Sequence, residues 1–186
     1  MATAKSKKPL TTRDNLSALI ASARKILRKD KGLNGDVDRL PLLTWVMFLK
    51  FLDDLEFKHE QEAALDGKRY QPIIEKPYRW RDWATREDGI TGDELLDFVG
   101  QEHAHRADGS FGQGLFAYLR SLGGKGEKGS QREVIANVFK GVQNRMVSGY
   151  LLRDIVNKIN GIHFSASEEI HTLSHLYESM LREMRD

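Results

Sequence analysis

Residues 40–55 read LPLLTWVMFLKFLDDL, the densest apolar run in the chain. Lys50 is the only charged residue of this run before Asp53. At the helical period of 3.6 residues, the apolar positions cover nearly the whole circumference, so a helix here has to be buried on several sides. Each large side chain left in water would forfeit about 1.5 to 3 kcal/mol of burial free energy. The run therefore predicts a central helix that several other helices cover.

The flanking residues predict where this central helix begins and ends. A strand is disfavoured because buried strands rarely exceed about 8 residues, whereas this run continues into a polar helical pattern. A membrane span is excluded because it needs about 20 apolar residues and acidic residues end the run early. We expect Asp38 to be the N-cap, Pro41 to lie in the first turn and Gly67 to stop the helix.

The composition favours one soluble cytoplasmic domain. A chain of 186 residues is long enough for a single good core. The absence of cysteine excludes disulfides and thiolate metal sites, which suits the cytosol. The N-terminal residues MATAKSKKPLTTRDN contain no apolar run after the lysines, so they are not a secretory signal peptide.

Positive charge is concentrated at the N-terminus. Residues 1–32 hold nine basic and two acidic residues, a balance of +7, so the remainder of a chain with net charge +2 sums to −5. A basic end on a mildly acidic body is one mark of a polyanion partner. The same charges also fit a solvated tail followed by an ordinary helix face.

Amphipathic patterns predict further helices and an all-α class. After a disordered basic tail over residues 1–10, a helix opens at Thr11 or Thr12, and shorter helices are expected at 115–122 and 150–159. The last helix carries an apolar stripe to the end of the chain. Three capping boxes, each a hydroxyl residue with Glu three positions later, mark further helix starts: Thr91 with Glu94, Ser130 with Glu133, and Ser165 with Glu168. Residues 11–186 thus predict a single helical domain of about seven helices around the central one.

The segment between Gly67 and Gly92 is expected to be irregular, with room for a short β-hairpin near residues 70–83. Its large aromatic side chains predict that the segment lies across the core with its arginines outward. Alternating basic and aromatic residues also fit stacking on nucleic-acid bases, and packing in the core is the favoured interpretation. The aromatic residues concerned are Tyr70, Tyr78, Trp80 and Trp83.

Two glycine-rich stretches invite a nucleotide or cofactor interpretation. The sequence DGSFGQG at 108–114 superficially matches the turn with which methyltransferases hold S-adenosylmethionine, but the preceding QEHAHRA is not expected to be a strand, so a polar loop is favoured. The sequence GGKGEKGS at 123–130 lacks the Gly-Lys-Ser/Thr order of a phosphate-binding loop. A mobile surface loop, whose lysines are available to a DNA backbone, is the interpretation there.

Histidine and carboxylate pairs predict no catalytic set. His171 and His175 share one helical face, as in zinc sites, but no Glu lies between them to act as a base, and ordinary helix histidines are favoured. His103 and His105 are expected to point to different sides of a helix end. A helix would splay the adjacent residues Asp53 and Asp54 apart. The residues alone describe a helical binding or assembly module.

Several segments together resemble a known family. TWVMFLKFLDDLE resembles the central helix, and SASEEIHTLSHLYESMLREMRD the closing helix, of the helical N-terminal domain of the modification subunit of type I restriction-modification systems. YRWRDW fits the aromatic segment between them, and IVNKINGIHF fits the spacing before the last helix. The resemblance covers about residues 12–186.

This resemblance implies an adenine-N6 DNA methyltransferase that uses S-adenosylmethionine. The family's catalytic domain, with its Asn-Pro-Pro-aromatic motif, is expected after residue 186, so the resemblance assigns no catalytic, cofactor-binding or metal-binding residue here. The implied partners are double-stranded DNA, the specificity subunit, a second modification subunit and, in the full complex, the restriction subunit. The alternative is a helical protein-interaction adaptor without DNA contact.

Within this family, the helical domain is expected to help close the complex around DNA. Enzymes that flip a base benefit from such a clamp, since unstacking costs a few kcal/mol. Eight basic residues are predicted to touch phosphates without reading sequence. They are Arg24, Lys25, Arg28, Lys29, Arg79, Arg81, Lys125 and Lys128.

Overall fold

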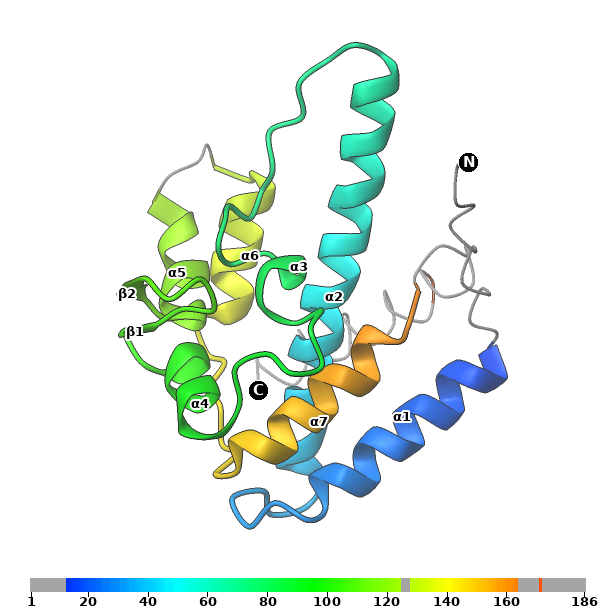
Figure 1. Cartoon of the computed structure of the whole chain (residues 1–186), viewed down its shortest axis with the longest axis vertical. Helices are drawn as coiled ribbons and strands as arrows, with labels where there is room; N and C mark the ends of the chain where they lie inside the picture. The colour runs from blue at the N-terminus through cyan, green and yellow to red at the C-terminus, as the bar shows by residue number, and fades with distance from the viewer. Residues whose placement is uncertain (1–12, 125–127, 164–170, 172–186) are drawn as a thin grey trace.

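The computed structural model describes residues 13–124, 128–163 and 171. Within these residues the chain is almost entirely helical, with one small two-stranded antiparallel sheet, which confirms the all-α prediction (Figure 1). The elements are α1 (Arg13–Leu27), α2 (Asp36–Leu65), α3 (Trp80–Trp83), α4 (Gly92–Gly100), β1 (His103–His105), β2 (Phe111–Gln113), α5 (Leu115–Ser121), the 3-10 turn η1 (Leu122–Gly124), α6 (Gln131–Phe139) and α7 (Gly149–Asn160).

The long helix α2 is the centre of the fold, as its sequence predicts. Figure 1 shows α1 to the right of α2, the group α4, α5 and α6 to its left, and α7 crossing in front of its lower part, where it contacts both α1 and α4. Trp45, Val46 and Met47 are almost fully buried, and the Trp45 ring meets the ring of Phe116 edge-on at 5.0 Å between centroids. Apolar side chains around the whole helix explain why it needs neighbours on both sides.

The start of α2 differs from the prediction, whereas its end agrees. The helix begins at Asp36, so Pro41 lies in the second turn and Asp38 is inside the helix rather than its N-cap. The Asp38 carboxylate instead accepts the Asn34 N–H at 2.8 Å and binds Arg145. At the other end Gly67 has a φ of +66°, a left-handed conformation that suits glycine, and the helix stops there.

The aromatic segment before α3 packs into the core as predicted. Tyr78, Trp80 and Trp83 are at most 5% exposed, which leaves none of these three rings available for stacking on a base. The indole N–H of Trp80 donates to the Asn160 side chain at 2.9 Å and so joins α3 to α7. Burial of these rings holds the short α3 between α2 and α7.

The expected hairpin near 70–83 is wrong in position, because residues 70–79 form no strand and the hairpin lies at 103–113. The backbone N–H groups of Ile73 and Ile74 donate to the buried carboxylate of Glu56 on α2. Donors that are satisfied by a side chain need no partner strand, so this segment stays irregular.

The hairpin β1-β2 also corrects two expectations for residues 101–107. His103 to His105 form a strand paired with Phe111 to Gln113, although no strand was expected at these residues. Residues two apart on a strand lie on the same face. Both imidazoles accordingly contact the ring of Phe111 while Ala104 is buried, so His103 and His105 do not point to different sides.

The predicted capping box at Ser130 forms in part, because its glutamate accepts the N–H of the residue before the N-cap, and the box at Thr91 does not form. The Ser130 hydroxyl accepts the Glu133 N–H at 3.3 Å, and the Glu133 carboxylate accepts the Gly129 N–H. At α4 the Thr91 hydroxyl instead donates to the carbonyl of Gly149, because α4 and α7 meet closely at their first residues. The box at Ser165 lies outside the described residues, as do the predicted tail 1–10 and most of the last helix. In the described part of the chain, each helix is too short or too polar to cross a bilayer.

Candidate nucleic-acid interface

The last turn of α1 and the turn residues that follow it carry a cluster of exposed basic side chains. Their positions follow from the amphipathic pattern of α1, whose apolar residues Ala23 and Leu27 are fully buried and face α7. None of the ion pairs between described residues involves a member of the cluster. We call this set the cationic cluster: Lys25, Arg28, Lys29 and Lys31.

Arg24, a fifth basic residue nearby, is used within the fold. Its guanidinium donates to the Asp36 carboxylate at 2.8 Å, which ties α1 to the first turn of α2. A cation held by a carboxylate gains less from a phosphate, since that carboxylate has to be displaced or shared. Among the predicted contacts on α1 and the turn after it, Lys25, Arg28 and Lys29 therefore make no ion pair with a described residue.

A buried carboxylate holds the cationic cluster in place. Asp30 is 4% exposed and follows directly after α1. It accepts the N–H of Gly32 at 2.8 Å, and it also accepts the N–H groups of Val147 and Ser148, which lie before α7. The turn after α1 is thus fixed to the start of α7. Its acidic side chain also lies where the dipole of α7 favours negative charge.

Backbone packing reinforces the same junction. A Cβ on Gly32 would lie 2.2 Å from the carbonyl oxygen of Arg145, so only glycine allows this approach. The Arg145 guanidinium binds Asp38 at 2.7 Å while its side chain stays 64% exposed. Arg145 thus adds a basic group beside the cluster. Sequence reasoning missed it because no local signal relates Arg145 to residues more than 100 positions away.

Arg79 and Arg81 do not point outward as expected. Arg81 donates to Asp53 at 2.9 Å and to Glu60 at 2.6 Å, both on α2. Arg79 makes a two-pronged ion pair with Asp82, at 2.9 and 2.7 Å. Their side chains are only 22% and 14% exposed. The bidentate pair of Arg79 with Asp82 stabilises the start of α3, whereas Arg81 joins α3 to α2.

The pKa shifts of Asp53 and Arg79 reflect burial and ion pairing within the fold. Burial raises the pKa of Asp53, and the hydrogen bond and charge of Arg81 act in the opposite direction. The hydrogen bond to Asp82 raises the pKa of Arg79. Because three carboxylates already surround the two guanidiniums, a phosphate would meet a locally negative site.

Two predicted contact residues follow η1 in the sequence. Lys128 is exposed, and Lys125 lies outside the described residues.

The other sequence candidates assemble no catalytic site. Residues 108–114 form the hairpin turn and β2, not a turn between a buried strand and a helix, so they do not fit S-adenosylmethionine. Asp53 and Asp54 are splayed as expected, toward Arg81 and Lys50 respectively. The described residues contain no group of three or more metal-ligating side chains. His171 is exposed, and His175 lies outside the described residues.

The fold and the cluster thus define a helical domain with a rigidly mounted basic end. A family model described as the HsdM N-terminal domain matches residues 16–159. The chain belongs to this family. That finding confirms the resemblance to type I modification subunits.

Two relatives of known structure share this fold. A modification subunit assigned to a type I restriction enzyme of Vibrio vulnificus YJ016 is 66% identical, with a TM-score of 0.85 over 97% of this chain and 37% of its own. A chain from a structure on complex assembly and conformational transition of the type I restriction-modification system is 37% identical, with a TM-score of 0.66 over 94% of this chain and 31% of its own.

A curated relative supports the same family assignment. The methylase subunit of the type I restriction enzyme EcoEI of Escherichia coli is 37% identical over 171 residues, which is 92% of this chain and 32% of the relative. The chain therefore spans about a third of the length of the proteins it matches.

Proposed function

We propose that this chain is the non-catalytic helical region of a type I DNA adenine-N6 methyltransferase subunit and that it helps to hold duplex DNA. The parent enzyme uses S-adenosylmethionine, and the residues described for this chain form no site for it. Its partners are the specificity subunit, a second modification subunit and, in the full complex, the restriction subunit. It acts in the cytoplasm.

The observation that carries the DNA proposal is the cationic cluster. Its members project from a junction that Asp30 holds rigid, and no carboxylate among the described residues binds them. Contacts of this kind attract phosphates without reading sequence, which leaves the choice of target to the specificity subunit. Lys128 is a candidate for a further contact, whereas Arg79 and Arg81 serve the fold.

Salt-dependent DNA binding tests the proposal. We compare the unmodified chain with the variant Lys25→Glu, Arg28→Glu and Lys29→Glu by fluorescence anisotropy of a labelled duplex at rising salt. Three phosphate contacts should contribute a slope of about −2.7 to log K against log salt, or about a 40-fold loss of affinity between 50 and 200 mM. The variant should lose this contribution.

A matched control separates local contact from net charge. The variant Lys58→Glu, Lys68→Glu and Arg69→Glu changes the charge equally with exposed residues at the far end of α2 and just beyond it. It should retain most of the binding. Equal losses in both variants, or binding that is indifferent to salt, would contradict the proposed contact.

The alternative function, a protein-interaction adaptor, has one observation in its favour. Val147 and Tyr150 at the start of α7 are 62% and 69% exposed, and exposed apolar side chains of this size suit a protein partner. An adaptor would keep its subunit partners after charge reversal of the cationic cluster and would bind no DNA in either form.

A further inference from the structure

A hollow of about 500 Å³ lies between α4 and the hairpin β1-β2. Carboxylates of α4 and rings of the hairpin line it, namely Glu94, Asp97, His103, His105 and Phe111. Figure 1 shows the hairpin at one edge of the molecule, with α2 between it and α1. The hollow is therefore well separated from the cationic cluster at the end of α1.

The hairpin presents an aromatic ring to this hollow. The strand register places His105 opposite Phe111, and residues two apart on a strand share a face, so both imidazoles lie beside the Phe111 ring. The rings of His103 and Phe111 are 6.4 Å apart between centroids and inclined by 19°, and the ring of His105 meets that of Phe111 at 5.2 Å and 68°. Phe111 is still 63% exposed. A ring that is oriented by its neighbours and open to solvent is suited to a contact with a partner.

Helix α4 holds two carboxylates on the other wall of the hollow. Glu94 and Asp97 are three residues apart, so they share one face of the helix, and both are exposed. None of the ion pairs between described residues involves either carboxylate. Leu95, Phe98 and Val99 on the buried side of α4 are fully enclosed, which fixes the position of the helix.

The surroundings of the hollow are also acidic. Residues 92–113 contain five acidic residues and one arginine. One of the acidic residues, Glu102, is paired with Arg120 at 2.9 Å. The arginine, Arg106, is engaged in the fold, where it donates to the Ser110 hydroxyl at 2.8 Å. A surface of this charge repels phosphates and attracts cations, so the hollow suits a cationic group.

We propose that this hollow binds an arginine side chain of a protein partner. A guanidinium is a planar cation, so it can stack on Phe111 while its N–H groups donate to Glu94 and Asp97. A lysine ammonium is a strongly hydrated point charge without a plane to stack, so it fits less well. A metal ion fits less well too, since the described residues contain no group of three side chains able to hold one. The contact uses a surface apart from the cationic cluster and stands independently of DNA binding.

Titration with short peptides tests the proposal. One blocked pentapeptide carries a central arginine between glycines, and a second carries lysine in the same place. In amide NMR spectra of the isotope-labelled chain, the arginine peptide should shift the signals of α4 and the hairpin in a saturable way, and the lysine peptide should bind more weakly. Shifts spread over the whole surface, or equal binding of both peptides, would overturn the proposal.

Substitutions at the hollow locate the contact. Phe111→Ser should weaken the binding of the arginine peptide about 2- to 5-fold, the loss expected of an exposed contact between a cation and a ring. Asp97→Asn should weaken it by a similar factor, since one acceptor loses its charge. Both positions are exposed, so the fold is retained.

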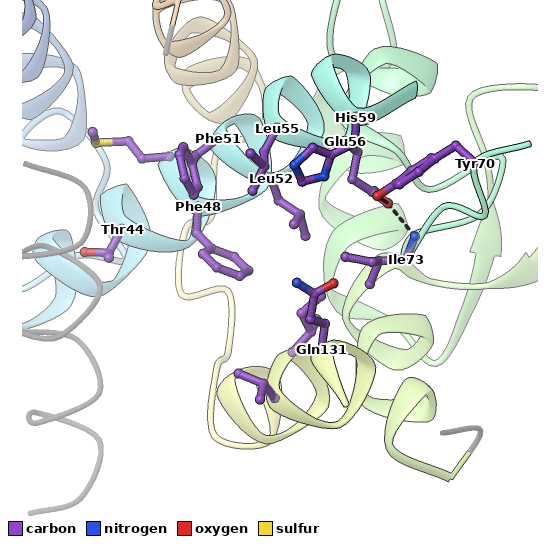
Figure 2. A pocket seen from close by; sticks show the side chains of 13 residues that line it. Thr44, Phe48, Phe51, Leu52, Leu55, Glu56, His59, Tyr70, Ile73 and Gln131 are labelled. Carbon is purple, nitrogen blue, oxygen red and sulfur yellow. Dashed lines mark hydrogen bonds between the residues drawn. The ribbon is translucent and has the colours of Figure 1, made fainter. Parts of the chain in front are cut away.

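Matched controls come from a second hollow, between α2 and α6. Figure 2 shows Gln131 of α6 at this hollow, which Val134 also lines. Gln131→Lys changes the net charge by as much as Asp97→Asn, and Val134→Ser removes an apolar side chain that is 44% exposed. Neither control should alter the binding of the arginine peptide. Equal losses in the controls contradict an arginine site at the hairpin. Shifts of the hairpin signals that grow with protein concentration in the absence of peptide would assign the hollow to a second copy of the chain and also refute the proposal.

Discussion

Removing the Asp30 carboxylate should destabilise the junction that carries the cationic cluster. The side chain is 4% exposed and accepts hydrogen bonds from the backbone N–H groups of Gly32, Val147 and Ser148. In Asp30→Ala these three donors lose their acceptor. A hydrogen bond to a charged group contributes about 1.5 to 3 kcal/mol, and water entering the partly buried site recovers part of the total. We therefore expect the free energy of unfolding to fall by about 3 kcal/mol.

The loss is large enough to measure by two methods. For a domain of this size, 1 kcal/mol lowers the Tm by about 2 to 4 °C, so Asp30→Ala should unfold about 6 to 12 °C lower. Urea titration followed by tryptophan fluorescence reports the same change, because all three tryptophans are in the core. Asp30→Asn should also be clearly destabilised. The asparagine NH₂ group would replace one acceptor oxygen and would then lie against a backbone N–H, so two donors would meet without an acceptor.

An exposed carboxylate on α7 provides the control. Asp154→Ala removes an exposed carboxylate from α7 and should change the free energy of unfolding by less than about 0.5 kcal/mol. If Asp30→Ala is no less stable than this control, the three hydrogen bonds do not hold the junction and the argument for a rigidly mounted cluster fails.

Three further predictions test the core, the helix contact and the buried carboxylate. Trp45→Ala should cost about 3 to 5 kcal/mol in urea unfolding because the ring is fully buried; a loss under about 1 kcal/mol would contradict its central place. Gly149→Ala should unfold at much lower temperature than Gly100→Ala, because the added Cβ would lie 1.7 Å from a carbonyl oxygen of α4 at the first site and meets nothing within 4 Å at the second. Burial and the neighbouring Glu56 carboxylate raise the pKa of Tyr70 to about 12. Ultraviolet titration should show this phenol ionising late and Glu56→Gln lowering its midpoint; the raised pKa also means that the contribution of Tyr70 to stability is present below about pH 10 and is lost as the pH rises toward 12.

Several features could be predicted from local sequence because their cause is local. The apolar circumference of α2 required burial, and Gly67 supplied the left-handed residue at its end. The burial of Trp80 and Trp83 followed from the cost of leaving large rings in water. Each prediction depends on the residue itself or on neighbours within a few turns.

The errors concern residues whose partners are distant in sequence. Arg81 was expected to face solvent, but Asp53 and Glu60 bind it from another helix. A hairpin was expected near residues 70–83. It does not form there because the Glu56 carboxylate accepts the N–H groups of Ile73 and Ile74, which would otherwise need a partner strand. The Thr91 hydroxyl was expected to cap its own helix, α4, but it donates to the Gly149 carbonyl of α7.

By itself, the sequence determined the central helix, the amphipathic helices around it, the burial of the large aromatic rings and how much positive charge would gather at one end. Only the tertiary structure decided which of those charges remain available. Periodicity and side-chain burial are properties of one helix, whereas pairing depends on which carboxylates the packed helices bring within about 3 Å of a guanidinium. For this reason the cationic cluster makes no ion pair with a described residue, whereas Arg24, Arg79 and Arg81 are held by carboxylates of the fold.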